Sequence, residues 1–158
     1  MQQDHIERTV DHVAIDRLLR SYADVLDRRA WTELPGLFAP DATVELDLVT
    51  SPVRTIDGPE LLAEFIAGAV ARFSFFEFVV LNAHIELWPN GDRDAATARV
   101  FMCELRQEVA SGERSDAYGL YRDRYVRTAD GWRFAHRRYR SMARFPAGDV
   151  FPLPHLDG

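Results

Sequence analysis

The sequence predicts an α+β domain in which helices near the amino terminus pack on one face of a curved, mostly antiparallel sheet. Apolar residues early in the chain follow the i, i+3, i+4 spacing of a helix, at Ile15, Leu18, Leu19, Tyr22 and Leu26. Strand-like stretches separated by turn signals fill the later half. Helices grouped before antiparallel strands are typical of the α+β class.

The first half of the chain is expected to form three helices and one strand. The apolar spacing predicts a helix over about 4–27, and a shorter helix follows over about 31–38. Alternating residues then predict a strand over 42–48. A Gly-Pro pair begins a third helix over about 59–72, because proline fits the first helical turn.

The second half is expected to form a sheet. Strands are predicted over about 76–88, 95–109 and 117–128, because Asn-Gly-Asp and Ser-Gly-Glu turn signals separate these stretches. One more strand follows 130–131, and simple alternation divides its side chains between two faces. One face would carry Trp132, Phe134, His136 and Arg138, and the other Arg133, Ala135, Arg137 and Tyr139.

Length and composition predict one domain with one core. The chain has 158 residues, 47% of them hydrophobic, which suffices to bury a stable core. The domain is expected to span 1–145. The proline-containing tail, 146–158, is not expected to continue the sheet, so it would be disordered or form an apolar flap.

Charge and targeting signals narrow the class of partner and the compartment. A net charge of −6 argues against nucleic acid, whose phosphates require a basic face. No apolar run approaches membrane-spanning length, and the amino terminus carries no export signal, so no membrane partner is expected. The single cysteine, Cys103, excludes an intramolecular disulfide and is expected on a buried strand. These features favour a cytoplasmic protein.

Several segments spread over nearly the whole chain carry a family resemblance. They are Tyr22-Ala-Asp-Val-Leu-Asp27-Arg-Arg-Ala-Trp31, Leu37-Phe38-Ala-Pro-Asp41-Ala, Asp57-Gly58, His84, Gly119-Leu-Tyr121-Arg-Asp123-Arg-Tyr125 and Asp130-Gly131-Trp132-Arg-Phe. Together they resemble the SnoaL-like group of the nuclear-transport-factor-2-like superfamily. The resemblance implies a cone-shaped α+β barrel. This cone hosts enzymes, binding modules and structural subunits, so the fold does not fix the function.

The dehydratases of this group share the most residues with the chain. Their acid/base pair is an aspartate late in the first helix and a histidine from the sheet, which match Asp27 and His84. One member of the group, bile-acid 7α-dehydratase, has a tyrosine five residues before the aspartate, which matches Tyr22. Its last-strand arginine corresponds to Arg137, Arg138 or Arg140. Where scytalone dehydratase has a second catalytic histidine, this chain has Glu104 or Arg106 instead.

Such a pair has a definite chemistry. An aspartate bound to one imidazole nitrogen raises the basicity of the other, which abstracts a proton from the carbon next to a carbonyl. The protonated histidine then gives its proton to a departing hydroxyl. Tyr22, with either Tyr118 or Tyr121, would donate hydrogen bonds to the enolate oxygen. Tyr118 and Tyr121 point to opposite strand faces, so at most one of them faces the interior.

The sequence therefore predicts a cofactor-free lyase or isomerase that acts on a small hydrophobic cyclic substrate, polyketide-like or steroid-like. The residues assigned to substrate binding are Tyr118, Tyr121, Arg137, Phe65 and Phe101. No spacing typical of a metal site is present. Two alternatives stay open: a scaffold subunit similar to the small subunit of ring-hydroxylating dioxygenases, and a small-molecule-binding module. A homodimer or higher homo-oligomer formed through the sheet is expected in each case.

Overall fold

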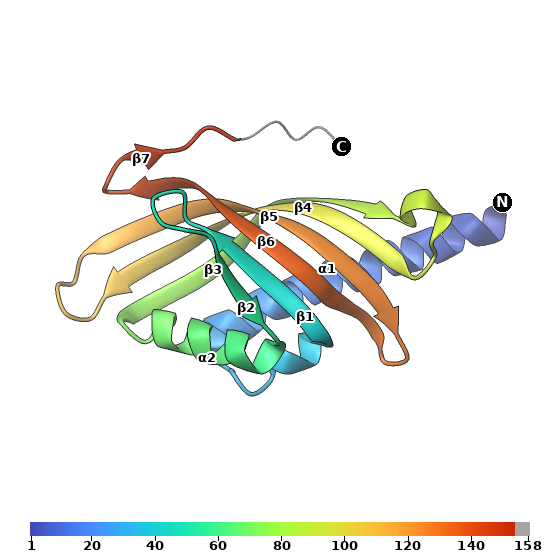
Figure 1. The fold of residues 1–158 in the computed structure, drawn as a ribbon, viewed down its shortest axis with the longest axis horizontal. Helices are drawn as coiled ribbons and strands as arrows, with labels where there is room; N and C mark the ends of the chain where they lie inside the picture. The colour runs from blue at the N-terminus through green and yellow to red at the C-terminus, as the bar shows by residue number, and fades with distance from the viewer. Residues whose placement is uncertain (154–158) are drawn as a thin grey trace.

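The structure is a computed structural model and describes residues 1–153. Two α-helices and two short 3₁₀-helices accompany one curved sheet that does not close on itself (Figure 1). The elements are α1 (Gln2–Arg28), η1 (Leu34–Leu37), β1 (Phe38–Asp47), β2 (Arg54–Asp57), α2 (Pro59–Val70), β3 (Phe73–Leu87), η2 (Pro89–Gly91), β4 (Ala95–Glu108), β5 (Arg114–Thr128), β6 (Gly131–Phe145) and β7 (Asp149–Val150). The predicted α+β class is confirmed.

Helix α1 forms where the apolar spacing predicts it. The five residues that define the spacing are all buried, with Ile15 fully enclosed. The helix ends because Arg29 adopts a left-handed conformation, with φ of 56°, and its N–H donates to the carbonyls of Val25 and Leu26. This packing fixes the last turns of α1 against β3 and points Tyr22 into the domain interior.

The strands follow the order β2-β1-β6-β5-β4-β3, and β7 pairs with β6. Strand β1 runs parallel to β6, and every other pairing is antiparallel. Before β7, three elements differ most from the prediction. The short helix at 31–38 is a single 3₁₀ turn, β1 starts four residues earlier than expected, and β2 was not predicted. Strand β2 is four residues long, which is too short for an alternation signal.

One extra residue in β6 reverses the predicted faces of that strand. Tyr125 pairs with Phe134 and Arg124 pairs with His136, so Ala135 has no partner on β5 and forms a bulge. Each residue after a bulge turns to the opposite face. Trp132 and Phe134 therefore share the inner face with Arg137 and Tyr139, whereas His136 lies on the outer face. The prediction from simple alternation was wrong beyond Ala135.

The part of the interior around Tyr22 is filled by aromatic rings. Tyr22 contacts Phe78, Phe134 and Phe38 with ring centroids 5.3, 5.7 and 6.2 Å apart. The predicted core position of Trp132 is confirmed, and Trp31 packs against the core while partly buried. Cys103 is buried on β4, as expected.

The carboxy-terminal tail joins the sheet in part. Asp149 and Val150 form β7 and pair with Arg144 and Ala143 of β6, so the expectation that the tail cannot continue a sheet was wrong at this point. Pro146 precedes the paired residues and Pro152 follows them, so β7 itself contains no proline. The rest of the predicted flap, 154–158, lies outside the described residues. Within 1–153, none of the helices combines the length and the apolar character needed to cross a bilayer.

Candidate functional site

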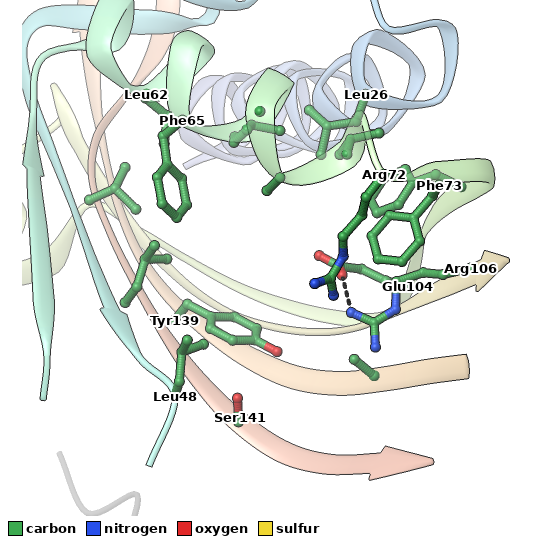
Figure 2. A pocket seen from close by; sticks show the side chains of 18 of the residues that line it. Leu26, Leu48, Leu62, Phe65, Arg72, Phe73, Glu104, Arg106, Tyr139 and Ser141 are labelled. Atoms are coloured by element: carbon green, nitrogen blue, oxygen red, sulfur yellow. Dashed lines mark ion pairs between the residues drawn. The ribbon is translucent and has the colours of Figure 1, made fainter. Parts of the chain in front are cut away.

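A cavity of about 580 Å³ lies between α2 and the inner face of the sheet (Figure 2). Its volume is typical of a small-molecule site. One wall is apolar and comes from α1, β1 and α2, with Leu26, Leu46, Leu62, Phe65 and Ile66. Strands β4 and β6 supply most of its polar side chains. The cavity therefore joins an apolar surface to a small group of ionisable residues.

The ionisable group is centred on Glu104. The inner face of β4 presents Val100 and Met102, and the same alternation places Glu104 and then Arg106 on the cavity wall. Arg106 Nη1 lies 3.6 Å from Glu104 Oε2, and Arg106 Nε donates to the Ser115 hydroxyl at 3.1 Å. Figure 2 shows Arg72, from the turn between α2 and β3, also pointing toward this carboxylate.

The surroundings of Glu104 favour the protonated form of its carboxyl group. Burial raises the pKa of the Glu104 carboxyl above its ordinary value, and the Arg106 and Arg72 cations oppose that rise only in part. Among the described residues nothing donates a hydrogen bond to this carboxylate, because the Arg106 contact is too long. Of the residues that line the cavity, Glu104 alone carries a carboxylate. A bound molecule would therefore meet one carboxylate that accepts no hydrogen bond from the described residues.

Tyrosine side chains line the cavity from three elements, α1, β5 and β6. Burial raises the pKa of Tyr139 to about 12 and that of Tyr121 well above its ordinary value. Burial also raises the pKa of Tyr22, although the Arg137 cation opposes this. All three phenols therefore stay protonated at neutral pH and can donate hydrogen bonds. Ser141 adds a buried hydroxyl to the same wall.

Behind Tyr22 and Tyr121 lies a fully buried ion pair. Arg137 Nε donates to Asp123 Oδ1 at 2.7 Å and Nη2 donates to Oδ2 at 3.1 Å, and the Tyr125 hydroxyl donates to Oδ2 at 2.6 Å. The guanidinium carbon is 3.8 Å from the Tyr121 ring centroid and 4.5 Å from that of Tyr22. Arg137 does not line the cavity, although it was assigned to substrate binding; it contacts Tyr22 and Tyr121, two of the three tyrosines that do.

The structure does not bring Asp27 and His84 together. Asp27 is exposed at the end of α1, and its Oδ1 accepts from the Phe78 N–H at 2.6 Å. His84 lies six residues beyond Phe78 on β3, which corresponds to roughly 20 Å at strand spacing. Its ring is 58% exposed, 3.5 Å from Glu86 on the outer face of the sheet. Neither residue lines the cavity, so the predicted dyad is not formed.

A second bulge explains the orientation of His84. Val80 pairs with Met102 and Asn82 pairs with Phe101, so Leu81 is an extra residue in β3. Simple alternation from the buried Phe76 and Phe78 would place His84 inside. The bulge reverses that, and Ala83 and Ile85 face the core instead.

The other predicted site residues divide into two groups. Tyr22, Tyr121 and Phe65 line the cavity, whereas Tyr118 and Phe101 lie on the outer faces of β5 and β4 and do not. The polar lining residues Arg72, Tyr139 and Ser141 were not predicted as site residues. Glu104 and Arg106 had a signal, because they continue the inner-face alternation of an otherwise apolar strand. Within 1–153, no three His, Cys, Asp or Glu residues are grouped to hold a metal ion.

Comparison with known proteins gives one family and several relatives. A family model described as a SnoaL-like domain matches residues 7–138. An uncharacterized protein of Mycobacterium tuberculosis is 30% identical over 132 residues, covering 80% of this chain and 82% of that protein. The Dehydratase cfoI of Aspergillus candidus is 26% identical over 133 residues, covering 82% and 73%.

Solved structures show the same fold. The hexachlorocyclohexane dehydrochlorinase LinA-type3 of Novosphingobium barchaimii superposes with a TM-score of 0.75 at 22% sequence identity. The match covers 95% of this chain and 99% of that one. The likeness extends over the two helices and the curved sheet that enclose the cavity.

Proposed function

This chain belongs to the SnoaL-like domain family, and on that basis we propose that it is a cofactor-free lyase or isomerase with Glu104 as its general base. The substrate is a small hydrophobic, ring-containing molecule with an acidic proton next to a carbonyl. The observation that carries the proposal is the single carboxylate in the cavity lining, which has a raised pKa and no hydrogen-bond donor among the described residues. In this proposal Glu104 takes the role of base that the sequence assigned to the dyad of Asp27 and His84.

The reaction follows from the position of the side chains. Glu104 removes the proton from the carbon next to the carbonyl, and the electron pair moves onto the carbonyl oxygen. A phenol of Tyr139 or Tyr121 donates a hydrogen bond to this enolate oxygen, an interaction strengthened by the low polarity of the site. The enolate then expels a hydroxide from the next carbon, and the proton on Glu104 converts it to water. Return of the proton to another carbon would give the isomerase reaction.

The names of two compared proteins are consistent with this chemistry. A dehydratase and a dehydrochlorinase both eliminate a leaving group and a proton from neighbouring carbons. Loss of water and loss of hydrogen chloride need the same element, a base directed at a carbon-bound proton. Glu104 would supply that base here.

A panel of cyclic β-hydroxy-ketones tests the proposal. Elimination yields a conjugated enone, whose absorbance reports the rate. We expect turnover with one or more members of the panel and a loss of roughly 10²–10⁴-fold in Glu104→Gln, because the amide cannot accept the proton. Glu86→Gln, on the outer face of β3, is the matched control and should keep the wild-type rate. Unchanged turnover in Glu104→Gln would refute the role of this carboxylate.

A binding module gives a different result in the same experiment. Its ligands would bind to the wild type, but none of them would be converted. No turnover would be seen in the wild type or in Glu104→Gln. The scaffold-subunit alternative predicts neither binding nor turnover by the isolated chain.

A further inference from the structure

We infer that the substrate of this site carries a carboxylate, which binds Arg72 and Arg106 while its apolar part lies against α2. The inference rests on the proposed function, because it names the class of substrate for the same cavity. It begins with a charge count. Arg72 and Arg106 carry two positive charges beside the single negative charge of Glu104. One further carboxylate would neutralise the group.

The local charge is opposite to that of the whole chain. The protein has a net charge of −6, yet the residues lining the cavity include three arginines and one carboxylate. A cavity whose lining carries more positive than negative charge, in a protein that is acidic overall, favours an anionic ligand.

One of the three arginines is already occupied. Arg144 donates to the Thr50 hydroxyl and the Ser141 hydroxyl, each at 3.1 Å, and to the Leu48 carbonyl. These contacts tie the β1–β2 loop to β6. Arg144 therefore has a structural role, and the ligand is left to the other two arginines.

Arg72 and Arg106 both lie against the ring of Phe73. Their guanidinium carbons lie 4.7 and 5.2 Å from the centroid of the Phe73 ring. Within 1–153, the Arg72 guanidinium has no hydrogen-bond or ion-pair partner, and the Arg106 Nη2 atom donates no hydrogen bond. Two planar guanidinium groups with free N–H donors match the geometry of a carboxylate.

The shape of the cavity sets the rest of the ligand. Phe65, Leu62 and Ile66 of α2 form the apolar wall. A ligand anchored by its carboxylate at Arg72 and Arg106 would extend along this wall, with the Glu104 carboxylate beside it. The recognised carboxylate is thus separate from the carbonyl that activates the proton.

Binding of 1-naphthylacetate and of its neutral analogue 1-naphthylacetamide tests the inference without turnover. Both have the same ring system, and only the first carries a charge. Isothermal titration calorimetry should give an affinity for the acid roughly tenfold or more above that for the amide. A difference of this size is the effect expected of one charged hydrogen bond. Arg72→Gln and Arg106→Gln should each reduce this preference severalfold. Arg99→Gln, on the outer face of the same strand, should leave it unchanged.

Each contrary outcome overturns the inference. Equal affinities for acid and amide, absence of binding by both, or an unchanged preference in Arg72→Gln would refute it. Loss of acid binding in Arg99→Gln would place the anion on the outer face instead. Arg72 is exposed on a turn, so its variant is not expected to unfold. Turnover of neutral ketones without acid preference would refute this inference alone, and acid preference without any turnover would refute only the proposed function.

Discussion

Asp123 and Arg137 face each other across β5 and β6 and form a two-point ion pair that solvent does not reach, with Arg137 1% exposed. The pairing depends on the bulge at Ala135, which turns Arg137 inward opposite Asp123. Although burial opposes it, the Asp123 carboxylate raises the pKa of Arg137 above its ordinary value, so the cation persists. The pair supports Tyr22 and Tyr121 from behind the cavity wall.

Removal of one partner should destabilise the domain strongly. Asp123→Ala leaves the Arg137 cation buried without its carboxylate, and we expect a loss of about 3–5 kcal/mol in the free energy of unfolding, measured with urea. The double variant Asp123→Leu, Arg137→Met replaces both charges with apolar groups and should recover most of that loss. A single variant as stable as the wild type would contradict the strength assigned to this pair.

The two bulges mark the limit of prediction from this sequence. The burial of Tyr22 and the positions of the long strands follow from periodicity, which reports local geometry. An extra residue in a strand changes no local pattern, yet it reverses every side chain beyond it. The bulges at Leu81 and Ala135 therefore account for the unexpected positions of His84 and Arg137.

The sequence did not predict most of the polar cavity residues, for a different reason. Arg72, from the turn after α2, and Tyr139, from β6, line the same cavity as Glu104 only in the folded chain, and such proximity between distant segments leaves no signal in a single sequence. Glu104 could have been found, since a carboxylate that continues an apolar inner face requires an explanation. The resemblance directed attention to His84 instead.

Gly119 is required because the Tyr139 ring packs over its backbone. A Cβ atom at this position would lie 2.0 Å from Tyr139 Cε2, so Gly119→Ala must displace the ring into the cavity. We expect a loss of about 1–3 kcal/mol in unfolding free energy and weaker ligand binding. Gly36→Ala, where a Cβ meets nothing within 4 Å, is the control. If the steric account holds, Gly119→Ala costs little in a Tyr139→Ala background.

Asp11 joins the amino-terminal helix to two distant indoles. It accepts from Trp88 Nε1 and Trp132 Nε1, each at 3.0 Å, and from Arg127 Nη1 and Nη2 at 2.9 and 2.7 Å. Burial raises the pKa of Asp11, but these hydrogen bonds lower it more, to below its ordinary value of 3.8. A lowered pKa means that the stabilisation is present above pH 3.8 and is lost as the pH falls through the folded-state pKa.

Asp11→Asn should therefore destabilise the protein in a pH-dependent way. We expect a loss of roughly 2–3 kcal/mol near neutral pH, less than for a fully buried pair because Arg127 is 37% exposed. The difference from the wild type should shrink as the pH falls below 3.8. Asp94→Asn removes an exposed partner of the same arginine and should change stability by less than about 1 kcal/mol. A gap that does not vary with pH would contradict this assignment.

Variants of the predicted dyad separate the two models of catalysis. His84 projects from the outer face of β3, so we expect His84→Ala to keep elimination activity within about twofold of the wild type. Asp27→Ala removes the acceptor of the Phe78 N–H and should cost about 1 kcal/mol of stability. A loss of roughly 10²-fold or more in His84→Ala would restore the dyad model and count against Glu104.

Glu104→Gln should inactivate the protein and yet stabilise it at neutral pH. Burial, opposed only in part by Arg106 and Arg72, raises the pKa of Glu104 above its ordinary value of 4.5. Below pH 4.5 the carboxyl is protonated in both the folded and the unfolded chain, so it has no effect on their balance. As the pH rises above 4.5, the unfolded chain loses this proton first, and the free energy of unfolding decreases until the folded-state pKa is passed. Glutamine cannot ionise, so the variant avoids this decrease.

Urea unfolding of Glu104→Gln and the wild type from about pH 8 to about pH 4 measures the difference. The variant should be the more stable protein at the upper end, and the two curves should converge toward pH 4.5 and below. Glu86→Gln, whose carboxylate is 60% exposed, should follow the wild type throughout. A Glu104→Gln protein less stable than the wild type at neutral pH would mean that Arg72 and Arg106 hold the carboxylate as a structural ion pair. In that case Glu104 would be satisfied in the folded state, and a carboxylate kept ionised by two cations is a weak base. The same measurement therefore decides between a strained catalytic group and a structural one, because only the first is costly to the fold.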